Sequence, residues 1–199
     1  MILIRDFETD DLERVGDIMA DSFCGKFRRL SKAPPGRVRA LVMGSGVLHQ
    51  DPFKGYIVAE LDSEVVGVML LKWKGQKRPL YMPVDHSTGW WERTRLAWGL
   101  GLLDHSPVEG EMYVEFIGVS EKARGRGVGT AMLKRGKDIT SEMGMSSFTL
   151  YVASSNAQAI GVYRRMGFET SKEVRSVISR RLMGVGEWWF MECPIESIG

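Results

Sequence analysis

The chain has 199 residues, 44% of them hydrophobic and 26% charged, a composition that suits one globular domain of mixed helices and strands. The 27 Lys and Arg against 25 Asp and Glu give a net charge of +2, which argues against a general nucleic-acid or membrane surface. Cys24 and Cys193 lie far apart without Cys or His neighbours, so we expect no disulfide framework, no metal site, and a reduced cytoplasmic protein.

The first half of the chain predicts strands and helices from its apolar spacing. Thr9-Asp10-Asp11 supplies capping side chains for a helix that Gly25 is placed to end. Asp62-Ser63 joins two β-rich runs, as in an antiparallel hairpin. The predicted elements are a strand at 2–7, helices at 12–25 and 34–44, strands at 56–59 and 65–71, and a loop with an amphipathic helix in 72–108.

The second half alternates strands with helices. The run 112–119 is apolar on both faces except at Glu115, the pattern of a central buried strand. A strand, a helix and a second strand in quick succession imply parallel pairing through a right-handed crossover. After the first strand we predict a helix from about 128, a strand at 148–152, a helix at 156–166 ended by Gly167, and antiparallel edge strands at 174–178 and 188–191.

The segment after the strand 112–119 has the features of a phosphate-binding loop. Its glycines permit positive φ angles and a close ligand approach, and the amides that open a helix favour an anion. Neither the Walker Gly-Lys-Ser/Thr nor the dinucleotide G-x-G-x-x-G spacing is present, and the alternative is a loop that merely joins two elements. A diphosphate is the expected ligand of Arg124, Gly125, Arg126, Gly127, Val128, Gly129 and Thr130.

Two motifs carry a resemblance to a known family. Arg124-x-x-Gly127-x-Gly129, directly after a strand, resembles the acetyl-CoA motif [R/Q]-x-x-G-x-[G/A] of the GNAT superfamily of N-acetyltransferases. A second string downstream follows the family's pattern N-x-x-A-x-x-x-Y-x-x-x-G-F. Its residues are Asn156, Ala159, Tyr163, Gly167 and Phe168.

The resemblance implies an α/β (α+β) GNAT fold, with a mixed sheet of six or seven strands and helices on both faces. It implies a single domain over 1–199, an acetyl-CoA core at about 111–170, and acceptor selection by about 20–50 and 170–195. The strands ending at Val119 and Val152 would splay apart around the pantetheine arm of acetyl-CoA, the co-substrate. The partner would be a small-molecule or peptide amine, and a homodimer is one possible assembly. The rival functions are a catalytically silent acyl-CoA-binding module and an unrelated nucleotide-binding protein.

The resemblance also suggests roles for single residues. Tyr163 takes the position of the general acid, although its helical spacing also suits an ordinary core residue. Asn156 caps its helix or bonds the pantetheine arm. The main chain of Ile117, Gly118 and Val119 would pair with pantetheine amides and offer an N–H to the oxyanion.

A base must take the proton of the amine, and the residues themselves suggest a candidate. Glu115 is the one carboxylate in the apolar strand, on the face of Ile117 and Val119, where burial would raise its pKa. The alternative is a carboxylate paired with an arginine or at the mouth of the cleft, and Glu111 is a second choice. His49, His86 and His105 form no cluster, so we interpret them as surface or structural residues.

Overall fold

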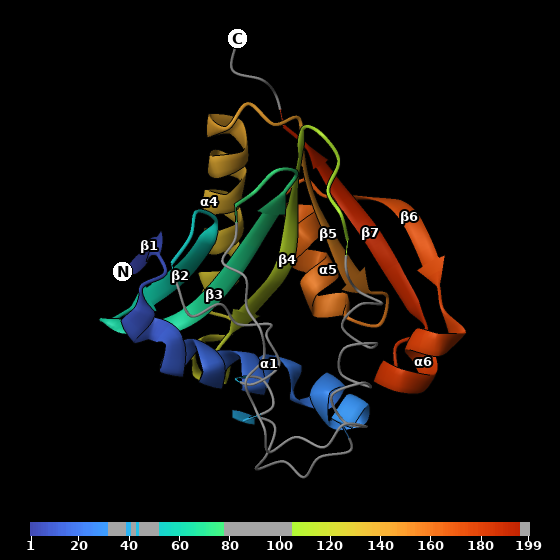
Figure 1. Cartoon of the computed structure of the whole chain (residues 1–199), viewed down its shortest axis with the longest axis horizontal. Helices are drawn as coiled ribbons and strands as arrows, with labels where there is room; N and C mark the ends of the chain where they lie inside the picture. Colours follow the sequence, from blue (N-terminus) through green and yellow to red (C-terminus); the bar gives the residue numbers. More distant parts are fainter. Residues whose placement is uncertain (32–38, 41–42, 44–51, 78–104, 196–199) are drawn as a thin grey trace.

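A computed structural model of the chain describes residues 1–31, 39–40, 43, 52–77 and 105–195. These residues form a seven-stranded sheet in the order β1-β2-β3-β4-β5-β7-β6, in which only β4 and β5 run parallel (Figure 1). The mixed sheet and the α/β fold are as predicted. The strands are β1 (Ile2–Asp6), β2 (Tyr56–Leu61), β3 (Glu64–Trp73), β4 (Glu111–Val119), β5 (Ser147–Ala153), β6 (Glu169–Arg175) and β7 (Glu187–Pro194).

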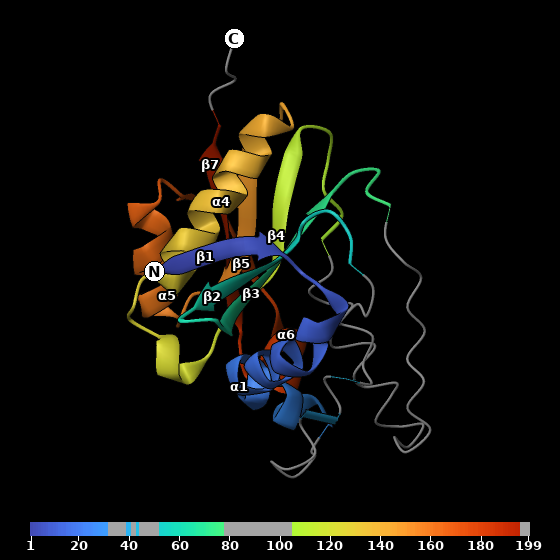
Figure 2. The same ribbon diagram turned by 90° about the vertical axis from the view of Figure 1, so that its left-hand side faces the viewer.

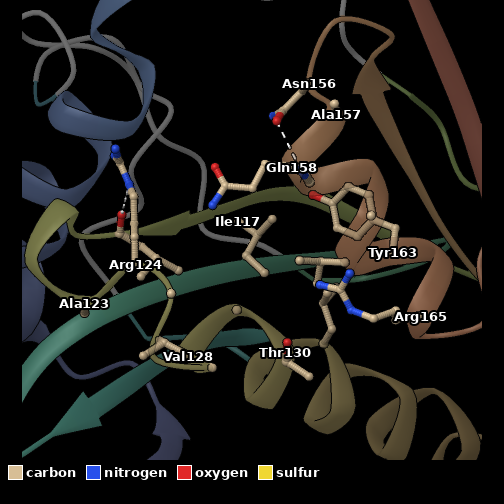
Figure 3. A pocket seen from close by; sticks show the side chains of 18 residues that line it. Ile117, Ala123, Arg124, Val128, Thr130, Asn156, Ala157, Gln158, Tyr163 and Arg165 are labelled. Carbon is tan, nitrogen blue, oxygen red and sulfur yellow. Dashed lines mark hydrogen bonds between the residues drawn. The ribbon is translucent and has the colours of Figure 1, made fainter.

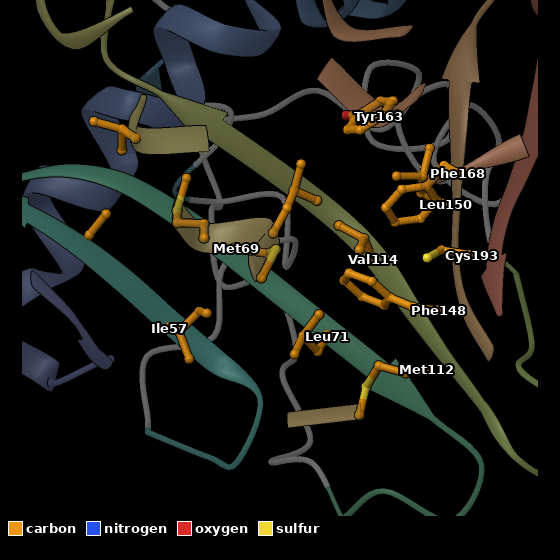
Figure 4. Close-up of a cluster of buried hydrophobic side chains, with 14 of the residues drawn as sticks. Ile57, Met69, Leu71, Met112, Val114, Phe148, Leu150, Tyr163, Phe168 and Cys193 are labelled. Atoms are coloured by element: carbon orange, nitrogen blue, oxygen red, sulfur yellow. The ribbon is translucent and has the colours of Figure 1, made fainter. Parts of the chain in front are cut away.

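Helices cover both faces of this sheet (Figures 1 and 2). One face carries α4 (Val128–Glu142) and α5 (Ala157–Arg165), and the other carries α1 (Leu12–Ser31) and α6 (Val177–Met183). Because successive strand residues point to opposite faces, each face has its own apolar cluster. In β3, Met69 and Leu71 belong to the cluster under α4 (Figure 4), whereas Val68 and Leu70 belong to the cluster under α1.

The hairpin between β2 and β3 forms at the predicted turn. Leu61 pairs with Glu64, so the loop is the two-residue connection Asp62-Ser63. Both residues have positive φ angles, 55° and 65°, the conformation that lets a two-residue turn follow the strand twist. The tight turn pairs β2 with β3, and β3 pairs in turn with β4, the middle strand of the sheet.

Two predicted boundaries are wrong. The first helix does not end at Gly25 but continues to Ser31, because a single helical glycine costs only about 1 kcal/mol relative to alanine and does not by itself stop a helix. The predicted strand 174–178 ends at Arg175, because the Ser176 hydroxyl accepts a hydrogen bond from Ser179 N (3.1 Å) and caps α6. The helices predicted in 34–44 and 72–108 lie largely outside the described residues.

Candidate active site

The two parallel strands, β4 and β5, separate about halfway along their length. β4 and β5 pair from Glu111↔Ser147 to Val114↔Leu150, although both strands continue beyond these residues. On its other side β4 pairs Val114 with Leu71 and Phe116 with Leu70, so Glu115 is the extra residue of a β-bulge. Because a bulge bends its strand, β4 turns away from β5 after Val114. The predicted splay of the two strands is confirmed.

A cavity of about 550 Å³ lies at this opening, between the end of β4, the glycine-rich loop and α5 (Figure 3). Residues that are distant in sequence meet in its walls. Most of the predicted cofactor-binding residues line it, namely Ile117, Val119, Arg124, Gly125, Gly127, Val128, Gly129, Thr130 and Asn156.

The loop before α4 has the backbone that an anion site requires. Gly125 and Gly127 have φ angles of 75° and 85°, and a Cβ on either would meet nothing within 4 Å. Val128, Gly129 and Thr130 form the first turn of α4, where amides have no acceptor within the helix. In the described part of the chain no main-chain acceptor is recorded for these three amides. The loop therefore offers several N–H groups and a helix N-terminus to one wall of the cavity.

The two arginines of the loop differ in position. Arg124 lines the cavity, and its Nε donates a hydrogen bond to the carbonyl oxygen of Val119 (3.3 Å), which ties it to the end of β4. Arg126 is not among the lining residues; its guanidinium pairs with Asp62 in the β2–β3 turn, with Nη2 3.5 Å from Oδ2. Arg124 is thus the loop cation placed for a ligand in the cavity.

Gly118 makes room on the opposite face of β4. It does not line the cavity, and a Cβ at this position would lie 3.0 Å from Ser22 Oγ and 3.4 Å from Ile18 Cγ2, both on α1. The glycine at 118 therefore allows α1 to approach this face of β4 closely.

The side chain of Tyr163 belongs to both the hydrophobic core and the cavity wall. Its ring is buried in the cluster under α4 and α5, 5.8 Å from the ring of Phe168. Its hydroxyl is directed into the cavity (Figure 3). Burial raises the pKa of this hydroxyl to about 12, so it keeps its proton at neutral pH. The two interpretations of Tyr163 from the sequence are compatible.

Asn156 caps α5, as expected. Its Oδ1 accepts a hydrogen bond from the amide of Ala159 (3.2 Å), one of the groups that a helix start leaves without a partner. The same residue lines the cavity, so a contact with a ligand remains open to it.

Neither of the two carboxylates suggested as the base lines the cavity. The side chain of Glu115 is exposed and does not line the cavity, because the bulge removes it from the regular alternation of β4. The burial on which its role was argued is absent. Glu111 is buried but engaged, since it accepts hydrogen bonds from Val108 N (2.9 Å) and Thr149 Oγ1 (2.6 Å) and lies 2.7 Å from His105 Nε2. A carboxylate with three such neighbours at the far end of β4 is a structural group, and so is His105.

One side of α5 was not recognised in the sequence. Gln158, Gly161, Val162 and Arg165 all line the cavity. They recur at three- and four-residue intervals, so they share one face of the helix. The helical spacing of these residues was visible in the sequence. Only the position of α5 beside the opening in the sheet shows that they form a wall of the cavity.

A mixed sheet that opens between its two parallel strands, with a glycine-rich helix start at the opening, is the arrangement that the resemblance to the GNAT superfamily implies. A family model, described as acetyltransferase (GNAT) family, matches residues 21–168. The chain therefore belongs to this acetyltransferase (GNAT) family.

Curated relatives match shorter stretches. A mycothiol acetyltransferase of Saccharomonospora viridis is 44% identical over 61 residues, which are 31% of this chain and 19% of that protein. A streptothricin acetyltransferase of Streptomyces lavendulae is 34% identical over 70 residues, which are 35% of this chain and 37% of that protein. The chain thus spans less than two fifths of the length of either relative.

A solved structure extends the likeness to nearly the whole fold. The PaiA N-acetyltransferase of Thermoplasma acidophilum, solved in complex with coenzyme A, superposes with a TM-score of 0.61 at 13% identity, over 98% of this chain and 99% of that one. At this identity the likeness concerns the fold. Among the helices of the described residues, none is long and apolar enough to span a membrane.

Proposed function

We propose that the chain transfers the acetyl group of acetyl-CoA to the primary amine of a small molecule or a peptide. One observation carries the proposal: the amide-rich start of α4, the parted strands β4 and β5 and the hydroxyl of Tyr163 all meet in one cavity. Coenzyme A in the Thermoplasma structure supports the choice of cofactor, and the two relatives named for mycothiol and streptothricin support a small-molecule acceptor.

The cavity walls suit two parts of coenzyme A, the diphosphate and the pantetheine arm. At one end the amides of Val128, Gly129 and Thr130, with the guanidinium of Arg124, would hold the diphosphate. Further in, Ile117 to Val119 pair with β3 on one edge only, and their other edge faces the opening left by β5. This edge would bond the amides of the pantetheine arm as an added strand does, and Gly118 contributes to it through its main chain.

The remaining roles concern the acetyl group. When bound, acetyl-CoA supplies a thioester carbonyl for an uncharged amine to attack, with a thiolate as the leaving group. A main-chain N–H of the segment 117–119 would stabilise the negative charge that develops on the carbonyl oxygen. Tyr163 Oη holds a proton at neutral pH and, from its position in the cavity wall, would donate it to the thiolate.

The proton of the acceptor amine needs a separate path. A lysine-like amine has a pKa of about 10.4, so a base or a water relay must receive its proton at neutral pH. Glu115 follows directly after the last residue of β4 that pairs with β5, so it lies beside the opening and in contact with solvent. We assign Glu115 to receive this proton through water, or to orient the water that does.

The test is the release of coenzyme A thiol from acetyl-CoA over a panel of amines, with acetyl-CoA binding measured separately. Amine-dependent release with a mass increase of the amine by one acetyl group would support the proposal. Binding without release for any amine would favour the silent acyl-CoA-binding module. Failure to bind acetyl-CoA at all would contradict the proposal.

A further inference from the structure

A second arginine lines the cavity opposite the loop. Arg165 belongs to the last turn of α5, whereas Arg124 belongs to the loop before α4. Arg124 already donates to Val119 O. Arg165 has neither a hydrogen bond nor an ion pair with another residue that the structure describes, so its donors are available to a ligand.

The guanidinium of Arg165 lies over the cavity rather than away from it. A Cβ built on Gly161, one helical turn earlier, would lie 3.5 Å from Arg165 Nη1, so the side chain folds back along the face of α5 that lines the cavity. Figure 3 shows it reaching from α5 toward the start of α4.

The charges around this guanidinium favour an anion. Among the described residues that line the cavity none is Asp or Glu, and the two arginines are its cations. The neighbouring Arg164 points elsewhere, with its guanidinium carbon 5.6 Å from the centre of the Trp189 ring. An arginine without a carboxylate partner, at the rim of a cavity, presents a planar fork of donors that matches a phosphate group.

Coenzyme A carries two separate anionic groups, the diphosphate and the 3′-phosphate of its ribose. The proposed function assigns the diphosphate to the start of α4 and to Arg124, which line the cavity together with α5. We propose that Arg165 binds the 3′-phosphate and so makes the protein discriminate between coenzyme A and its 3′-dephospho form. This inference rests on the proposed function, because it requires coenzyme A in this cavity.

The experiment compares coenzyme A with 3′-dephospho-coenzyme A by equilibrium titration against the wild type and two variants. Arg165→Gln removes the proposed contact, and Arg164→Gln removes the same charge one residue away, outside the cavity. We expect the wild type to bind coenzyme A about tenfold more tightly than the dephospho form, as for one charge-assisted contact. Arg165→Gln should abolish this preference by weakening coenzyme A binding alone, Arg165→Lys should restore part of it, and Arg164→Gln should leave it intact.

Two outcomes would overturn the inference and leave the proposed function in place. Equal weakening of both ligands by Arg165→Gln would assign the residue to the diphosphate, and an unchanged preference would exclude it from phosphate binding. Failure of the wild type to bind either ligand would instead contradict the proposed function, so the two failures are distinguishable. The melting temperature without ligand shows whether each variant is folded.

Discussion

Tyr163 combines a buried ring with a hydroxyl that reaches the cavity. A tyrosine hydroxyl is costly to bury without a partner, so a purely structural residue at this position would be better served by phenylalanine. The ring is packed beside Phe168 and the hydroxyl lines the opening where the thioester of the proposed cofactor would lie. The packing fixes the position of the hydroxyl, which a proton donor needs.

Tyr163→Phe tests this division of roles. The substitution keeps the ring and removes only the proton donor, so we expect acetyl-CoA affinity to stay within a factor of two and turnover to fall about 100-fold, as for loss of a positioned acid. Steady-state thiol release and equilibrium binding measure the two quantities. Wild-type turnover in this variant would leave Tyr163 with a packing role alone.

The raised pKa of Tyr163 predicts a loss of stability at high pH. The ordinary pKa of a tyrosine is 10.0 and burial raises that of Tyr163 to about 12, so the folded chain holds a proton that the unfolded chain loses. The contribution of this proton to the free energy of unfolding is complete below pH 10 and disappears as the pH rises through 12. The total loss is about 2 to 3 kcal/mol, at roughly 1.36 kcal/mol per pKa unit.

Urea unfolding at about pH 9 and about pH 11.5 measures this loss. Burial also raises the pKa of Tyr56 and Tyr151, so the wild type alone does not isolate the effect. Tyr163→Phe lacks one of these groups and should lose less stability between the two pH values. Equal losses in both proteins would show that the Tyr163 hydroxyl titrates normally.

Among the elements, α5 shows what the sequence alone can establish. Asn156 at its start and Gly167 after its end are local signals, and the helix predicted at 156–166 is observed at Ala157–Arg165. Asn156 accepts the capping bond and Gly167 adopts a φ angle of 89°, as each signal requires. The phosphate loop is of the same kind, because its glycines and the helix start act within a few residues.

Features that depend on a neighbouring strand were not predictable in this way. The bulge at Glu115 is defined by the pairing of β4 with Leu70 and Leu71, which lie far away in sequence. A regular alternation along β4, assumed without this bulge, therefore predicted a buried side chain for Glu115. Arg165 likewise reads as an ordinary charge at a helix end. It becomes a residue of the site only because the crossover brings α5 beside α4.

The contact of α4 with the sheet gives a prediction at the scale of elements. A Cβ on Gly136 would lie 2.6 Å from Phe148 Cζ and 3.0 Å from Met69 Cε, so Gly136→Ala would overpack the core. We expect a net destabilisation of about 1 to 3 kcal/mol from overpacking, larger than the gain of about 1 kcal/mol in helix propensity. Denaturant midpoints at constant slope measure it.

Gly161→Ala is the matched control in α5. Its Cβ would make only an ordinary contact, 3.5 Å from Arg165 Nη1, so helix propensity should dominate and stability should stay equal or rise by up to about 1 kcal/mol. A Gly136→Ala protein as stable as this control would mean that α4 can shift away from β5 at little cost.

At the scale of the molecule, the cavity joins two parts of the sheet. Strands β1 to β4 lie on one side of the short parallel ladder and β5, β7 and β6 on the other, and the walls come from both sides. A ligand that contacts the start of α4, the end of β4 and α5 together should stabilise the whole chain. At 100 times its Kd such a ligand adds about 2.7 kcal/mol, a rise in melting temperature of roughly 5 to 10 °C.

Acetyl-CoA is the ligand to test, with ATP and NAD as controls that carry phosphates without the pantetheine arm. We expect the rise in melting temperature with acetyl-CoA alone. Hydrogen exchange should then show new protection in 117–119, in 127–131 and in α5, because the bound arm would lie against segments from both sides of the ladder. Protection confined to 124–130 would mean that only a phosphate group is held, and the opening between β4 and β5 would lose its proposed role.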